Sequence, residues 1–419
     1  MADLDDRALA RRLHDRFGFG PRPGDLDRGA DDALGRLLTA APAATPALQL
    51  APPAAPTKDK QAKQDANAAR AADEKKLLSW WLGRMVATDT AQERLTWFWH
   101  GHFATSEQKV RSPFHMLGQN EAFRRLGAGD FGELAKALVV DPALILWLDG
   151  NDNRSGAPNE NLAREFMELF TLGIGHYSET DVREAARALT GWTVKRDSAQ
   201  AVLTAKRHDD KPQTVLGVTS SFTAASFVDT VLAKPESAAF VVGRLWFRLV
   251  SATPPAPDAV DRLVAAYGAK RDVTAVLRAI AAEPAFRSAD TTLVKQPVEW
   301  VVGLMRALDV RWESLDDKAV KQLGTGLRGM GQVPLRPPSV GGWAAGGAWL
   351  TTAAGVARLT VARLLAARTA SKPADAEAAR VLLSVDAWSD RTRDALAKVD
   401  KPEDVIAVAA CAPEYVVSR

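Results

Sequence analysis

The densest cluster of residues able to do chemistry lies between Asn159 and Glu168. Pro158 disfavours helical geometry in the residue before it, and Asn159 is a favourable first residue for a helix, so a helix is predicted to begin here. At about 100° per residue, Asn161, Glu165 and Glu168 share the face opposite the apolar residues. Two carboxylates on one face could bind a divalent cation or divide the roles of acid and base.

Arg164 lies beside this polar face, where helical spacing allows it to pair with Glu160 or Glu168. In an enzyme, Glu165 and Glu168 would be ligands or acid and base, and Arg164 would orient them or bind an anionic substrate. The candidates from this segment are therefore Glu165, Arg164 and Glu168 as catalytic groups, with Asn159 and Asn161 as ligand-binding groups. The alternative is a solvent-exposed helix carrying ion pairs, because the Glu-x-x-Glu spacing is common by chance.

Four of the six histidines lie where they could contribute to a site. His100 and His102 are two positions apart, so on a continuous helix they point in different directions and converge only if Gly101 ends the helix. His176 lies between two acidic helical segments. Imidazole together with carboxylates suits zinc, iron or manganese, although each histidine could equally be a structural residue with satisfied hydrogen bonds. The candidate ligands of one divalent metal ion are His100, His102, Glu165, Glu168 and His176.

Two further candidates for ligand binding lie outside the polar segment. His208 precedes Asp209 in a predicted polar turn. Trp343 lies in the segment 331–349, whose Pro and Gly residues preclude a helix, so this segment is predicted to be an ordered loop or a lid. The tryptophan could line a ligand groove, and the packing of a long loop explains it equally well.

The elements that must position these residues are predicted to be helices. Apolar residues recur at helical spacing along most of the chain, which indicates an all-α protein with one large multi-helix domain. The exception is the region around 192–220, where Val202–Thr204 and Thr214–Leu216 resemble short strands flanking a polar turn. This region is predicted to form a small β-hairpin.

Composition divides the chain into three predicted parts. Residues 1–40 form an N-terminal helical arm, residues 41–57 an Ala- and Pro-rich linker, and residues 58–419 the main helical domain. Residues 58–76, at the start of the main domain, include few large apolar side chains and are predicted to form a solvent-exposed helix.

Charge and cysteine content exclude several classes of protein. The 54 basic and 51 acidic residues leave a net charge of +3, which gives no electrostatic case for a nucleic-acid partner. Cys411 is the single cysteine, so neither an intramolecular disulfide nor a cysteine-rich metal site can form. No apolar run approaches the roughly 20 residues that span a bilayer. The acidic start lacks the pattern of a secretory leader, and the sequence therefore predicts a cytoplasmic protein.

Several segments, in order along the chain, resemble the bacterial family named for domain of unknown function 1800. They are Arg94–Phe103, Ala157–Glu165, Asp181–Trp192, His208-Asp209, Gly243–Trp246, Lys295–Glu299, and Met330–Gln332 leading to Gly342-Trp343. The resemblance implies a helical fold and favours a set of site candidates without assigning their roles: Asn159, Arg164, Glu165, Glu168, His102 and His208. Family members often have histidine where this chain has Phe170, so the resemblance does not make position 170 a required ligand.

The resemblance also implies a partner. Many members resemble exported proteins with twin-arginine leaders, encoded beside an alkaline-phosphatase-like family, which is the partner expected here by resemblance alone. This sequence shows no such leader.

Two functional hypotheses remain. The first is an enzyme with an acidic-histidine pocket that acts on an unidentified small molecule, with or without a divalent metal ion. The second is a non-catalytic binding or assembly protein, in which the Asn159–Glu168 motif is an ion-pair network holding two helices and the loop 331–349 together.

Overall fold

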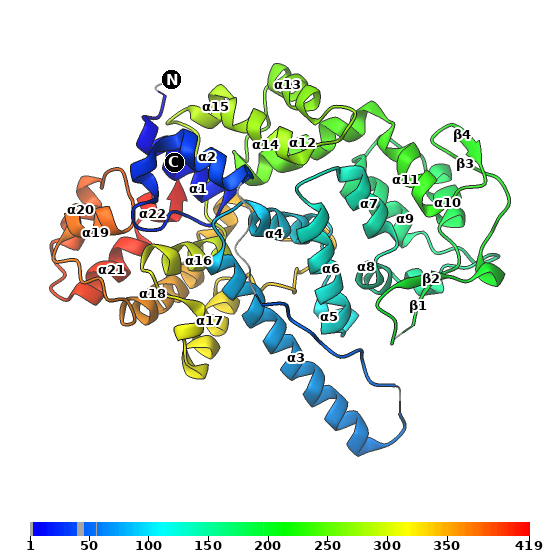
Figure 1. Ribbon diagram of the computed structural model, residues 1–419, viewed down its shortest axis with the longest axis horizontal. Helices are drawn as coiled ribbons and strands as arrows, with labels where there is room; N and C mark the ends of the chain where they lie inside the picture. Colours follow the sequence, from blue (N-terminus) through cyan, green and yellow to red (C-terminus); the bar gives the residue numbers. More distant parts are fainter. Residues whose placement is uncertain (1–2, 40–45, 56, 196) are drawn as a thin grey trace.

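The computed structural model describes residues 3–39, 46–55, 57–195 and 197–419, and nearly all of its regular structure is helical (Figure 1). This confirms the predicted all-α class. The helices are α1 (Asp6–Phe17), α2 (Gly29–Thr39), α3 (Lys60–Ala87), α4 (Gln92–His102), α5 (Glu107–Val110), α6 (Pro113–Leu126), α7 (Phe131–Val139), α8 (Pro142–Trp147), α9 (Asn161–Glu165), α10 (Glu179–Ala188), α11 (Ala224–Leu232), α12 (Pro235–Leu249), α13 (Pro257–Tyr267), α14 (Val273–Ala282), α15 (Pro284–Arg287), α16 (Pro297–Ala307), α17 (Asp317–Gly329), α18 (Thr352–Ala366), α19 (Ala376–Leu382), α20 (Asp390–Leu396), α21 (Pro402–Cys411) and α22 (Pro413–Val416).

The strands form three antiparallel pairs. These are β1 (Trp192–Val194) with β2 (Ala201–Leu203), β3 (Gln213–Val215) with β4 (Val218–Ser220), and β5 (Leu293–Val294) with β6 (Val417–Ser418). The region around 192–220 therefore holds two hairpins. The predicted pairing of Val202–Thr204 with Thr214–Leu216 is wrong, because each segment has a nearer partner. Leu216 and Gly217 both have positive φ (51° and 83°), which suits a two-residue hairpin turn between β3 and β4.

Two hydrophobic cores fill the body, and α4 lies between them. One core contains side chains from α1, α2, α7 and α9–α14, and the other contains side chains from α3, α16–α18 and α21. Trp99 of α4 belongs to the first core and Trp97 to the second. Nine of the eleven α4 residues are buried, including polar ones, so this helix is enclosed on all sides.

The first helix lies inside this body and does not stand apart as an arm. Ten of its twelve residues are buried, including charged ones that have found partners distant in sequence. The Lys295 ammonium lies 3.0 Å from an Asp15 carboxylate oxygen. Arg12 donates to the Thr291 carbonyl at 2.7 Å, and Arg16 donates to the Ser418 carbonyl at 2.8 Å. These bonds join α1 to the segment before α16 and to β6.

Helix α3 projects from the body (Figure 1). Its first half is largely exposed, as predicted for a solvated helix, and its second half enters the second core. The predicted linker 41–57 falls partly outside the described residues, at 41–45 and 56. Of the remainder, Pro46 accepts a hydrogen bond from the Trp80 indole at 2.8 Å, so this part of the segment lies against α3.

The buried pair in α1 gives a prediction about stability. Asp15→Asn should lower the free energy of unfolding by about 3–5 kcal/mol at pH 7, because it leaves the Lys295 ammonium buried without its counter-charge. Urea denaturation measures this loss. The Asp15→Asn, Lys295→Met double variant should lose less than the sum of the single variants.

The control is Asp390→Asn, which removes an ion pair with Arg393 whose two side chains are 90% and 57% exposed. It should leave the unfolding free energy nearly unchanged. Equal losses in Asp15→Asn and Asp390→Asn would contradict the assignment of the Asp15–Lys295 pair as the stabilising one.

Candidate functional site

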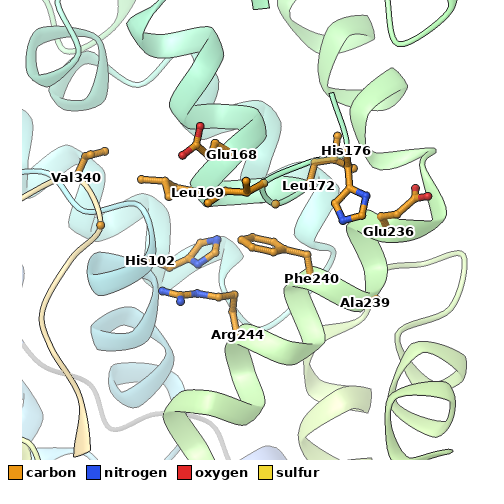
Figure 2. Close-up of a pocket in the computed structure, with 13 residues that line it drawn as sticks. His102, Glu168, Leu169, Leu172, His176, Glu236, Ala239, Phe240, Arg244 and Val340 are labelled. Atoms are coloured by element: carbon orange, nitrogen blue, oxygen red, sulfur yellow. The ribbon is translucent and has the colours of Figure 1, made fainter. Parts of the chain in front are cut away.

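A pocket of about 540 Å³ lies between the end of α4, the segment after α9, and α12 (Figure 2). Five polar or charged side chains line it: His102, Glu168, His176, Glu236 and Arg244. The rest of the lining is apolar or backbone: Leu169, Leu172, Gly173, Ile174, Ala239, Phe240, Val340 and Gly341. Mostly apolar walls with a few polar groups are typical of small-molecule sites.

One wall is built by an unusual helical turn. The helix that was predicted to begin near Asn159 starts as α9 and continues as a π-helix, η3 (Phe166–Thr171). The Leu172 amide donates to the Met167 carbonyl at 2.9 Å, five residues back, as π geometry requires. Such turns are rare and occur frequently at functional sites. Here the π-helix carries Glu168 and Leu169, which both line the pocket.

His102, the last residue of α4, has a defined protonation state. Its Nε2 lies 2.8 Å from the Phe170 carbonyl oxygen, which can only accept, so Nε2 carries the proton and Nδ1 carries the lone pair. Nδ1 is buried and has no hydrogen-bond partner among the described residues. Burial, as the main cause, and the charge of Arg244, as a second one, lower the pKa of His102 to about 3. His102 is therefore a neutral hydrogen-bond acceptor at physiological pH.

Arg244, on α12, is the cation of the pocket. Its side chain lies next to the His102 ring (Figure 2). Within the described parts of the chain, its guanidinium makes no hydrogen bond and no ion pair, and its Nε is buried. It lies over the Phe247 ring, 5.8 Å from the ring centroid. Burial lowers its pKa, and no carboxylate contributes to the shift. Arg248, one turn further along α12, instead donates to the carbonyls of Trp343 and Ala344 at 2.6 and 2.9 Å.

The two predicted carboxylates differ in their surroundings. Glu168 lines the pocket and accepts a hydrogen bond from the Tyr177 hydroxyl. Glu165 does not line the pocket, and it has no hydrogen-bond or ion-pair partner among the residues described. Burial raises the pKa of the Glu165 carboxyl, and the neighbouring Glu168 carboxylate raises it further. The structure therefore brings only Glu168 to the pocket.

The rest of the polar motif lies outside the pocket. Arg164 pairs with Glu160 at 3.1 Å and with Glu179 of α10 at 2.7 Å, and all three side chains are substantially exposed. The Asn159 side chain accepts a hydrogen bond from the Asn161 amide at 3.0 Å, so it stabilises the start of α9. This geometry is that of a surface helix with ion pairs. It joins α9 to α10, and among the described residues it makes no hydrogen bond or ion pair with the loop 331–349.

The five candidate metal ligands do not come together. His102, Glu168 and His176 line the same pocket, whereas Glu165 does not. His100 faces the other core, because α4 continues through Gly101. Its Nε2 accepts a hydrogen bond from the Leu335 amide at 3.0 Å. Across the described ranges, no three His, Cys, Asp or Glu side chains are grouped so that they could hold a metal ion.

The two remaining ligand candidates also lie away from the pocket. The Trp343 ring stacks on Trp97 with centroids 4.9 Å apart, beside a second cavity of about 10 Å³, roughly the space of one water. The His208 Nδ1 lies 2.9 Å from the Thr190 carbonyl oxygen. Gly191 has φ of 87°, and a Cβ there would lie 3.0 Å from the His208 backbone nitrogen, so glycine permits this close contact. Both residues hold loops in place.

Sequence reasoning missed Arg244 and Glu236. Arg244 falls within the Gly243–Trp246 segment that resembles the family, which was the only available signal. No local spacing relates α12 to α4, so its position beside His102 depends on the tertiary fold.

These features define a mostly helical protein with a small-molecule-sized pocket. Residues 12–417 match the family described as "Protein of unknown function (DUF1800)", and the chain belongs to this family. No curated protein and no solved structure matches the chain. Among the described residues, no helix is both long and apolar enough to cross a membrane.

The isolated Glu165 carboxyl gives a second prediction. Its raised pKa means that the folded state disfavours the ionised form, so ionised Glu165 destabilises the fold at neutral pH. Glu165→Gln should therefore raise Tm at pH 7 by about 1–2 °C. The gain should vanish below about pH 4, where the carboxyl is protonated in both states.

Differential scanning calorimetry between pH 4 and 8 measures this effect. Glu313→Gln, at an exposed position, serves as the control and should change Tm little at any pH. A fall of several degrees in Glu165→Gln would show instead that Glu165 belongs to a stabilising ion-pair network.

Proposed function

We propose that the protein binds a small organic anion in the pocket around Arg244. The observation that carries this proposal is that the Arg244 guanidinium has no hydrogen-bond or ion-pair partner among the described residues. A buried or half-buried charge is costly unless it is paired, and the described residues supply no carboxylate and no carbonyl to Arg244. A bound anion would supply the missing acceptor, and the fork of the guanidinium suits a planar anionic group.

The pocket also orients such a ligand. Arg244 and His102 lie at one end, and His176 and Glu236 lie at the other (Figure 2). Phe240 lies between these ends and offers an apolar surface. An anionic group at Arg244 would lie at the end far from the carboxylate of Glu236, and the rest of the molecule would extend along Phe240.

A catalytic role for Glu168 is the second candidate function. It is favoured by one observation: Glu168 lines the same pocket on a π-helix and is held by the Tyr177 hydroxyl. A carboxylate fixed at the wall of a ligand site can accept or donate a proton. Incubation of wild-type protein and Glu168→Gln with a small-molecule extract, followed by mass spectrometry, tests this role. Products formed equally by both proteins would exclude Glu168 as the catalytic residue.

The removal of Arg244 gives the third prediction. Arg244→Met should weaken the binding of organic anions at least tenfold, because it removes the only cation that lines the pocket in the described structure. Without ligand, the same variant should have a raised Tm, because it no longer holds an unpaired half-buried charge.

Thermal-shift titrations with carboxylates, sulfonates and phosphate esters measure both effects. The control is Arg278→Met, an exposed arginine on α14, which should alter neither the anion response nor Tm. A lowered Tm in unliganded Arg244→Met, together with an unchanged anion response, would contradict the proposal.

A further inference from the structure

The charges around the pocket restrict the kind of anion that it can hold. Arg244 is its single arginine or lysine among the described residues, whereas Glu168 and Glu236 both contribute carboxylates. His102 adds no positive charge, because burial keeps its pKa near 3. One cation and two carboxylates give these groups a net charge of −1, so the pocket repels an anion of charge −1 less strongly than one of charge −2.

The planar shape of the Arg244 guanidinium also favours a ligand of charge −1. A guanidinium binds a carboxylate through two parallel hydrogen bonds in one plane, and this pairing uses a single arginine. His102 Nδ1, the neutral acceptor beside it, cannot donate a further hydrogen bond to a phosphate oxygen. The pocket therefore offers one fork-shaped donor and little else to a highly charged group.

The apolar walls indicate what the anionic group is attached to. Leu169, Leu172 and Phe240 line the pocket beyond Arg244. Ile174 also lines it and is 75% exposed, which is unusual for so large an apolar side chain. An apolar chain lying in the pocket would cover these surfaces and gain free energy from their removal from water.

We infer that the ligand is a monocarboxylate with a short apolar chain, its carboxylate on Arg244 and its chain along Phe240 and the three aliphatic side chains. This inference rests on the proposed anion site and names its ligand class. It makes two separate demands: the charge must be −1, and affinity must grow with the length of the chain.

Isothermal titration calorimetry at pH 8 tests the charge. The probes are hexanoate, hexyl phosphate and hexanol, which share one chain and differ in the head group. Hexanoate should bind at least tenfold more tightly than either of the others, and Arg244→Met should lose this preference while Arg278→Met keeps it. If Arg244→Met does not fold by circular dichroism, Arg244→Lys replaces it, because lysine keeps the charge and lacks the fork.

The chain is tested with acetate, butyrate and hexanoate. Affinity should rise by about fourfold for each added methylene group, the usual gain for a buried CH₂. Affinity that does not depend on chain length would overturn the apolar part of the inference.

The remaining outcomes separate this inference from the proposed function. Hexyl phosphate that binds as tightly as hexanoate, and only when Arg244 is present, would overturn the monocarboxylate and leave the anion site standing. If neither anion binds to wild-type protein, or if both bind equally to Arg244→Met, the inference and the anion site both fail.

Discussion

The burial of α4 on all sides is the constraint on which the arrangement of the site depends. Trp97 and Trp99 project into different cores, so the helix cannot rotate without exposing large aromatic surface. The same fixed orientation separates His100 from His102. His100 is directed to the loop that follows α17, where it accepts a hydrogen bond from Leu335. His102 is directed to the π-helix and to α12. Packing thus accounts for the different directions of the two histidines.

The buried and half-buried arginines of this protein differ in whether their guanidinium groups have hydrogen-bond or ion-pair partners. Most buried arginines are neutralised or satisfied by hydrogen bonds: Arg16 and Arg306 bind backbone carbonyls, and Arg124 pairs with Glu93. Arg248 follows this rule through the carbonyls of the loop 331–349. Arg244 lies one turn away and breaks it. This contrast within one helix supports the proposed anion site at Arg244, since free energy of folding is often sacrificed at functional sites.

Sequence patterns predicted the features that depend on local physics. Helical spacing of apolar residues gave the fold class, and the polar composition of 58–76 gave the solvated start of α3. His102 and Glu168 were chosen from residue type and spacing, and both line the pocket. The pairing of the strands was missed because a two-residue turn at Leu216 and Gly217 outweighed the longer polar turn that was expected.

What the patterns could not supply was contact between distant segments. The place of Arg244 in the pocket is recognisable only when α12 is seen beside α4, and that it lacks a carboxylate partner among the described residues depends on the tertiary fold. For the same reason Arg164, which has the more suggestive sequence context, was favoured as an anion-binding residue. Its exposed pairs with Glu160 and Glu179 are local, and local pairs are what helical spacing can reveal.

The hydrogen bonds between α1 and β6 have a consequence for folding during synthesis on the ribosome. Arg16 and Ser418 are separated by 402 positions, so the first helix is made long before its partner exists. Until then, the partners of its arginines and of Asp15 have not been synthesised, so burial of these side chains would leave their charges unpaired. Closure of so long a chain segment is slow, because the entropy of the loop must be lost before the contact forms. Helix α1 can therefore make its contacts with β6 only after nearly the whole of this sequence has been synthesised.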